Sequence, residues 1–373
     1  MLVRHIFISL LLMSLPLLAL AQDGEKKNQP AVVKGAYWVK GLIDTMAVSG
    51  IDLDYLEVPK RPWQVELRST ANESSLKMDG VWDNGQGHKM TISSMSSSGF
   101  FTSLGVWAGY RGYGFGYSKE LKGGDGSTFS LGAVGGRFGV NLRYSTFRSK
   151  TPDLTVTNED GGVITTEDET IDLDAPIKVK SLFIDGYYLF NGKHFSYAAA
   201  YDQSIIQRRS AGSFVAGLMY YHTNVDYSDN SNWGLSYLMC GVGKIKVTQI
   251  SVGFGYSYNW VPARGWLVNV MAMPMLTFYN KLKFYSYPDI YSVNIDDIVT
   301  EEDYYNILLG DVNEKTLPNR VIVNFDGRMS VVYNWERVYL RATGLFNHFR
   351  YGDDKNNGWL ADWTAYLSLG FRI

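Results

Sequence analysis

Two residues of the 373-residue chain, His194 and Ser196, have the types and the spacing for nucleophilic chemistry. Residues two apart on a β-strand point to the same face, so the imidazole could take the hydroxyl proton of Ser196 during attack on a lipid ester. Such a site also needs a third group that orients the histidine, and only Asn191 lies nearby in the sequence. The simpler interpretation is a polar strand end that follows the turn at residues 191–193.

A second set of polar residues falls on one face of segments that otherwise alternate with apolar residues. This set consists of Arg137, Arg143, Asp185, Asp326, Arg328 and Arg341. An arginine that faced lipid near the membrane midplane would cost about 2–4 kcal/mol, so we expect these side chains to point into the lumen of a barrel. A lumen with charges of both signs either forms a salt-bridge network that closes the pore or lines a narrow path for polar solutes.

Acidic clusters are the remaining candidates for ligand binding. They are Glu159, Asp160, Glu167, Asp168 and Glu169 in one segment, and Asp296, Asp297, Glu301, Glu302 and Asp303 in another. Clustered carboxylates could hold divalent cations beside lipopolysaccharide phosphates, although solvated loops of like charge are the simpler interpretation. The histidines show no paired ligand spacing and Cys240 is the single cysteine, so no other metal site and no cofactor is expected.

The overall charge excludes one class of partner. The chain has 35 Lys and Arg residues against 37 Asp and Glu residues, a net charge of -2. A protein held to nucleic acid mainly by bulk positive charge would need a clear basic excess. We therefore expect no nucleic-acid partner.

The elements that must position these side chains are β-strands, because apolar residues recur with a period of two. In residues 363–373 the odd positions are apolar and the even ones mostly polar, and residues 321–333 and 338–346 alternate in the same way. Further strands are predicted near residues 63–71, 88–95, 103–110, 113–120, 136–148, 178–190, 212–226, 246–260 and 265–280. The total is twelve, within a range of ten to fourteen.

The lengths of these strands favour a transmembrane antiparallel up-and-down β-barrel over a soluble sandwich. Most span about 9–15 residues, whereas strands of soluble sheets usually have about five or six. Connections at residues 261–265 and 334–337 are short, while those at 150–177 and 281–318 are long and polar, as in outer-membrane barrels. Aromatic residues such as Trp260 gather near strand ends, where membrane headgroups would lie.

The domain organisation follows from the N-terminus. Residues 1–21 combine Arg4, an apolar run and a small-x-small cleavage pattern, which predicts a signal peptide and export. Residues 22–62 are expected to form a periplasmic segment or a lumen plug, and residues 63–373 the outer-membrane barrel. Counting back from the last strand places the long segment 191–211 on the periplasmic side, where it could hide another hairpin.

Three segments carry a resemblance to a known family. They are residues 110–118 (Tyr-Arg-Gly-Tyr-Gly-Phe-Gly-Tyr-Ser), residues 193–197 leading to 209–214, and residues 255–260. They resemble an uncharacterised domain-of-unknown-function family of outer-membrane β-barrels from gut-type Gram-negative bacteria. The resemblance implies the barrel and the membrane, and it brings no established activity and no catalytic residue.

The functional expectation is an outer-membrane β-barrel without enzymatic activity, either a structural or binding protein or a narrow, porin-like channel for small polar solutes. The alternative is an outer-membrane lipid hydrolase, similar to a phospholipase or a lipid A deacylase, that uses Ser196 and His194. Expected partners are outer-membrane lipid, lipopolysaccharide and the barrel-assembly machinery, since the terminal strand with Phe371 resembles its C-terminal aromatic signal. A conductance measurement beside a deacylation assay would separate these hypotheses.

Overall fold

The computed structural model describes residues 50–83, 89–97, 101–121, 126–149, 153–158, 177–226, 242–286, 313–316, 321–352 and 356–373. The predicted signal peptide, residues 22–49 and both acidic clusters lie outside the described residues. Among the described residues, no helix is long and apolar enough to cross a membrane.

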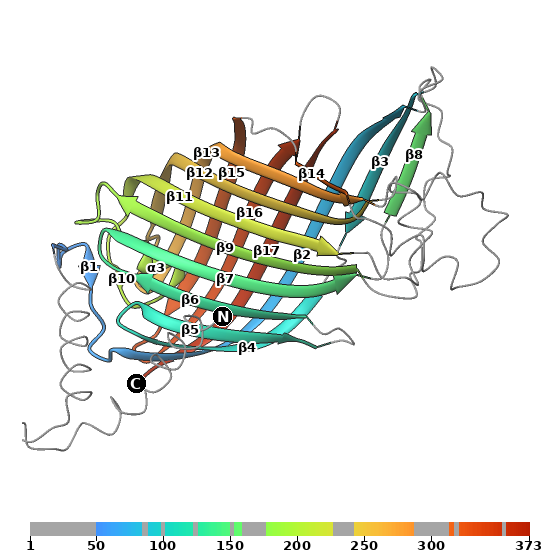
Figure 1. Cartoon of the computed structure of the whole chain (residues 1–373). Coiled ribbons are helices and arrows are strands. Elements are labelled where there is room, and N and C mark those ends of the chain that lie inside the picture. The colour runs from blue at the N-terminus through green and yellow to red at the C-terminus, as the bar shows by residue number, and fades with distance from the viewer. Residues whose placement is uncertain are drawn as a thin grey trace, which may run out of the picture.

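Twelve antiparallel strands form a closed barrel (Figure 1). They are β2 (Trp63–Asp83), β4 (Phe101–Tyr110), β5 (Tyr113–Glu120), β6 (Ser127–Val134), β7 (Phe138–Ser149), β9 (Ile177–Leu189), β11 (Ala211–Asp226), β12 (Val242–Trp260), β13 (Trp266–Ser286), β15 (Ile322–Asn334), β16 (Val338–Gly352) and β17 (Asn356–Arg372). Each strand pairs with the next barrel strand along the chain, and β17 pairs with β2 from Asn356–Gly80 to Arg372–Gln64. This last pairing closes the ring, so the predicted fold class is confirmed.

The predicted alternation separates the two faces of the barrel wall. On β17, Leu367 is 54% exposed on the outside, whereas the next residue, Ser368, is fully buried inside. The same contrast holds on β16 between outward Leu340 and inward Arg341. The outer face is thus apolar and the inner face largely polar, because consecutive strand residues point in opposite directions.

The predicted strand count is correct, but it contains two errors. Two predicted strands form one interrupted strand, and one strand of the barrel was missed. Residues 88–95 and 103–110 were expected as separate strands, yet β3 (Lys89–Ser97) and β4 both pair with β2 and continue one another. They form one interrupted return strand, of which β3 extends beyond the barrel rim. The eight-residue β6 was missed, because its inward positions are small or polar and it bears no charge. The two errors cancel in the total.

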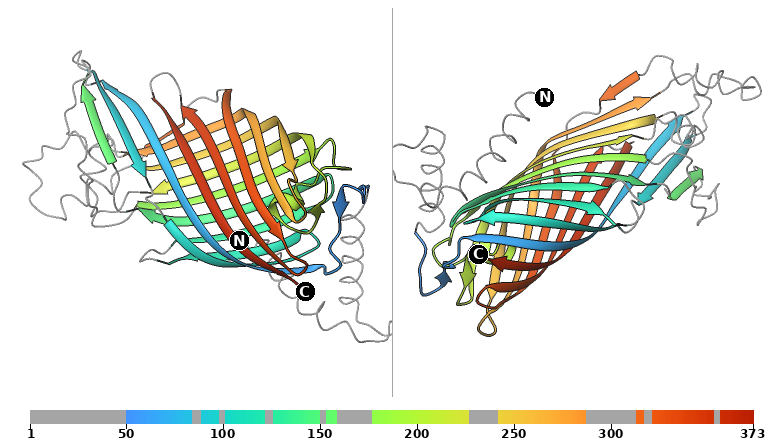
Figure 2. Two further views of the ribbon diagram at one scale, coloured as in Figure 1. Left: turned by 180° about the vertical axis from the view of Figure 1, so that it is seen from behind. Right: turned by 90° about the horizontal axis from the view of Figure 1, so that it is seen from below.

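The two ends of the barrel differ (Figure 2). At one, called the turn end, β2 begins, β17 ends, and short connections join β4 to β5, β6 to β7, β12 to β13 and β15 to β16. At the other, called the loop end, β3, β8 (Asp153–Asn158) and β14 (Asn313–Thr316) extend from the wall. The periplasmic assignment of the turn end stays a prediction.

One long connection, residues 191–210, does not form the extra hairpin that the sequence allowed. It folds into the turn end of the lumen and is called the plug here (Figure 1). Its short helix α3 (Ala198–Tyr201) has three buried alanines, and its β10 (Ile206–Gln207) pairs with β1 (Leu56–Glu57). Because Leu56 is also buried, part of the predicted N-terminal segment packs against the plug.

Candidate functional site in the barrel lumen

The plug is hydrogen-bonded to strands around most of the barrel wall. The strand residues that bind it include Gln64, Ser213, Asn259, Asn269, Arg328, Arg341 and Arg372, one each from β2, β11, β12, β13, β15, β16 and β17. Within the plug, the rings of Tyr197 and Tyr201 lie 4.4 Å apart, and Tyr197 also packs on Tyr187 of β9. These contacts fix the plug against many strands at once, so a simple swing out of the lumen would break several buried hydrogen bonds.

A buried carboxylate, Glu66 of β2, organises the wall above the plug. Its Oε2 accepts bonds from Arg68 at 2.6 Å and from Arg341 at 2.7 Å, and its Oε1 accepts one from Tyr339 at 2.7 Å. Arg341 also donates to the backbone carbonyl of Tyr201, which joins this cluster to the plug. Two guanidinium groups therefore share one carboxylate, and the wall has a local excess of positive charge.

Carboxylate groups outnumber guanidinium groups around Arg328 on β15. Its guanidinium lies 2.7 Å from Asp326 and 3.2 Å from Asp185, and it also donates to the hydroxyl of Tyr197. Asp185 accepts a further bond from Asn141 at 2.9 Å. One arginine thus balances two buried carboxylates, so this part of the lumen has a local excess of negative charge.

An ion pair crosses the lumen nearer the loop end. Arg143 of β7 lies 3.0 Å from Asp362 of β17, and five strand-to-strand steps around the ring separate these two strands. The guanidinium also lies over the ring of Phe183, 5.2 Å from its centroid. Beyond it, Tyr221 and Phe349 stack across the barrel with centroids 4.5 Å apart. Side chains from opposite walls therefore meet and narrow the lumen.

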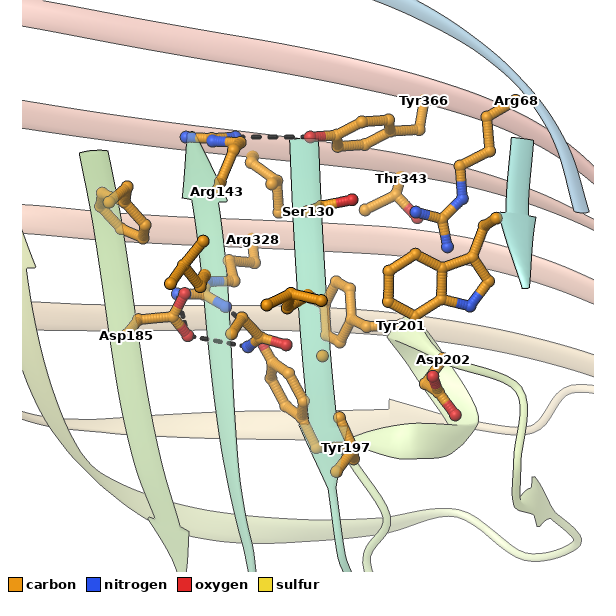
Figure 3. A pocket seen from close by; sticks show the side chains of 18 of the residues that line it. Arg68, Ser130, Arg143, Asp185, Tyr197, Tyr201, Asp202, Arg328, Thr343 and Tyr366 are labelled. Atoms are coloured by element: carbon orange, nitrogen blue, oxygen red, sulfur yellow. Dashed lines mark hydrogen bonds and ion pairs between the residues drawn. The ribbon is translucent and has the colours of Figure 1, made fainter. Parts of the chain in front are cut away.

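A cavity of about 140 Å³ remains between this ion pair and the plug. Tyr197, Tyr201 and Asp202 of the plug form its floor, while Arg68, Arg143 and Thr343 come from the strands (Figure 3). A second cavity of about 40 Å³ shares Arg143 and Tyr366 with it and is lined by residues nearer the loop end. Hydroxyl groups from Thr70, Ser118, Thr128, Ser145, Ser181 and Thr364 line that second cavity. The lumen thus offers polar surface on the loop side and a closed floor on the other.

Glycine residues create the space that Trp107 of β4 occupies in the cavity wall. A Cβ atom on Gly114 or Gly116 would lie 2.6 Å or 2.8 Å from the indole, and one on Gly132 would lie 3.0 Å away. The indole in turn supports Arg68, whose guanidinium carbon lies 4.3 Å from the ring centroid. The sequence signal for this arrangement was present, because Gly114 and Gly116 alternate along β5, but it did not reveal which ring they accommodate.

The structure places the predicted lumen residues at two kinds of position. Arg143, Asp185, Asp326, Arg328 and Arg341 lie on the inner face and take part in the clusters above. Arg137 departs from the expectation, because it lies in the turn between β6 and β7 and is exposed. Sequence reasoning missed Glu66, Arg68 and Asp362, which alternate into the lumen and supply partners for these arginines. The functional role of the whole set stays a prediction.

The expected strand geometry of His194 and Ser196 is wrong, because both residues lie in the plug rather than on a strand. The ring of His194 contacts Asn191 through Nδ1 at 3.1 Å and Asp52 through Nε2 at 3.3 Å. The hydroxyl of Ser196, which is 2% exposed, accepts a bond from the backbone N–H of Ala199 at 3.2 Å. The shared-face argument for nucleophilic chemistry therefore does not apply to this pair.

Metal ligation has no candidate in the described parts of the chain, where no three His, Cys, Asp or Glu side chains gather as a possible metal site. The residues of the two acidic clusters lie outside those parts. Divalent-cation binding at the clusters therefore stays a prediction.

The chain matches one protein family and is similar to several solved structures. A family described as a domain of unknown function (DUF4421) matches residues 50–372. The β domain of the Bordetella autotransporter BrkA is 12% identical, with 82% of this chain and 99% of that chain covered and a TM-score of 0.31. The translocator domain of autotransporter NalP from Neisseria meningitidis is 9% identical, with 91% and 95% covered and a TM-score of 0.30. The outer membrane protein OprG from Pseudomonas aeruginosa is 12% identical, with 83% and 96% covered and a TM-score of 0.24. No curated protein matches the chain.

Proposed function

The chain belongs to the DUF4421 family of unknown function, and we propose from its own geometry that it is an outer-membrane barrel with a closed lumen. In this proposal the barrel acts as a binding or structural protein and does not conduct solutes continuously. The observation that carries the proposal is the plug, which hydrogen bonds connect to seven strands.

The outer-membrane location is supported by the surface of the barrel. Large apolar side chains such as Leu218, Phe254 and Val270 are more than half exposed on the outer face, where water would be unfavourable and hydrocarbon favourable. Near the turn end, Trp260 and Trp266 are also exposed, as expected for rings at headgroup depth. Cell fractionation tests the location, since the protein should sediment with lipopolysaccharide; recovery in the soluble fraction would contradict it.

The closed state is supported by two barriers in series. The plug fills the turn end, and the Arg143–Asp362 pair spans the lumen beyond the cavity. An ion crossing the barrel would have to displace both, and separating this partly buried ion pair is unfavourable.

A narrow channel for small polar solutes is the second candidate, and the hydroxyl-lined cavity on the loop side favours it. That cavity would lead solutes to Arg143, but passage to the other end would still require the plug to move. We therefore place this function second and expect conduction only after the plug is displaced.

Conductance in planar bilayers tests the proposal. The wild-type barrel should give no sustained channel steps, whereas a variant in which residues 195–205 are replaced by a short Gly-Ser linker should give them. Heat-modifiable mobility on gels would show that both proteins are folded barrels. Sustained steps from the wild type would contradict the closed lumen and favour the channel.

A further inference from the structure

We propose that the cavity of about 140 Å³ binds a small monocarboxylate, with Arg68 and Thr343 holding its carboxylate group. This inference deepens the binding role proposed above and rests on it. Figure 3 shows both side chains on the cavity wall opposite the floor made by Tyr197, Tyr201 and Asp202 of the plug.

The charge on this wall favours an anion. Arg68 and Arg341 share the single carboxylate of Glu66 through the same oxygen atom, which leaves one positive charge in excess. Arg68 binds Glu66 only through Nε, and its two terminal nitrogens have no partner among the described residues. A guanidinium group with free terminal N–H groups matches the planar geometry of a carboxylate.

Unpartnered polar atoms gather in the same cavity. They are Trp107 Nε1, Arg341 Nε, Thr343 Oγ1 and Asn347 Oδ1, all on residues that line the cavity. Their side chains are at most 8% exposed, and buried polar groups normally have a hydrogen-bond partner. The hydroxyl of Thr343 can donate to a ligand bound by Arg68, and the remaining atoms make the cavity suited to a polar ligand.

The carboxylates in the cavity lining limit the ligand to one negative charge. Arg143, Arg328 and Arg341 are paired with Asp362, Asp326 and Glu66, respectively. The positive excess is therefore local to the Glu66 wall, where Arg68 is the second guanidinium group. A dianion such as phosphate would place a second charge opposite Asp185 and Asp202, which also line the cavity. A monocarboxylate avoids this repulsion.

The size and the rest of the lining favour a short apolar body. A cavity of about 150 Å³ holds benzene, so a ligand of roughly six non-hydrogen atoms would fit here. Phe183 and Leu345 supply apolar surface in the same cavity. The hydroxyl-lined second cavity, which shares Arg143 with the first, gives the ligand a polar approach from the loop end.

Isothermal titration calorimetry on the detergent-solubilised full chain tests this site with propionate as the probe. We expect saturable binding of propionate, and binding of propionamide or inorganic phosphate weaker by about ten-fold or more. The variant R68Q should lose about ten-fold or more in affinity, while Glu66 keeps its bonds from Arg341 and Tyr339. The variant T343V keeps the side-chain shape and should lose roughly three- to ten-fold.

The control variant is S330A, because the hydroxyl of Ser330 is also buried and unpartnered but does not line the cavity. Its affinity for propionate should equal that of the wild type. An absence of propionate binding, tighter binding of phosphate, or equal affinity of the wild type, R68Q and T343V would overturn the proposed site. These outcomes are independent of conductance, so a silent barrel without propionate binding would refute the ligand site and leave the closed lumen intact.

Discussion

Arg341 Nη2 lies 2.7 Å from Glu66 Oε2, although 275 residues separate the two in the chain. Glu66 is on β2 and Arg341 is on β16, and β17 lies between them at the closure of the barrel. Both side chains are buried, at 0% and 3% exposure. The pair therefore reaches over the closing strand and connects the first barrel strand to the one before the last.

Removal of this pair should destabilise the barrel. The variant R341M leaves Glu66 with Arg68 and Tyr339 but also frees the carbonyl of Tyr201, so we expect a loss of about 3 kcal/mol in the free energy of unfolding. The double variant E66Q/R341M should lose less free energy of unfolding than the two single variants together. In the double variant both members of the pair are removed, so no charged partner is left behind. Urea unfolding of the detergent-solubilised protein measures this, and strictly additive losses would contradict a direct pair.

Close packing around Trp107 gives a prediction for two glycines. The variant G114A places a Cβ atom 2.6 Å from both the indole and the carbonyl oxygen of Ala108, so it should cost about 1–3 kcal/mol. The matched control is G186A, whose Cβ atom would meet no atom closer than the carbonyl oxygen of Gly139 at 3.8 Å and should be tolerated. The unfolding temperature on heat-modifiable gels compares the two, and equal temperatures would show that the indole does not need this space.

A substitution on the outer face of the barrel tests whether this face contacts hydrocarbon or water. Leu218 is 55% exposed in the middle of β11, and the variant L218R should cost about 2–4 kcal/mol if this face contacts hydrocarbon. Leu53 is 66% exposed outside the barrel strands, so L53R should change stability by no more than about 0.5 kcal/mol. Unfolding in lipid vesicles provides the measurement; a neutral L218R would mean that the outer face meets water.

A pH dependence is expected from Asp202 in the plug. Burial raises the pKa of its carboxyl group above the ordinary value of 3.8, even though the backbone N–H of Ser204 donates to it. The folded state therefore holds this proton at pH values where the unfolded chain has released it, and the contribution to stability falls as the pH rises from 3.8 through the folded pKa.

The variant D202N removes this dependence. Its amide oxygen can still accept the bonds from Gln64 and Ser204, so we expect it to be more stable than the wild type at neutral pH. The advantage should disappear well below pH 3.8, where the wild-type carboxyl group is protonated in both states. Unfolding curves of both proteins across this pH range check the sign, and a D202N barrel that is less stable at neutral pH would contradict it.

The candidate site shows where inference from the sequence succeeded. Alternation assigned Arg143 and Arg341 to the face opposite Leu340 and its apolar neighbours, because a strand turns successive side chains to opposite sides. The same rule could not identify their partners. Asp362 pairs with Arg143 across the lumen, and Glu66 pairs with Arg341 across the neighbouring strand β17. Which residues face one another in this way depends on how the strands close into a ring.

The plug shows why other expectations failed. The pair His194 and Ser196 was given strand geometry from local spacing, but the segment bends into the lumen, where Asn259 and Gln207 bind its backbone. Gln207 lies beyond helix α3 in the chain, and Asn259 lies on β12. The alternation of residues near His194 and Ser196 therefore could not predict these bonds.

The sequence by itself determined that strands alternate, which face of each is apolar, and that about twelve of them form one sheet, since these properties depend only on the period of two along each strand. The tertiary structure alone decided that β3 and β4 share one return path, that residues 191–210 enter the lumen, and that Arg68 and Thr343 face one cavity. Those features arise from strand register and ring closure. Which residues meet across the lumen depends on the number of strands in the ring and on how each strand is aligned with the next.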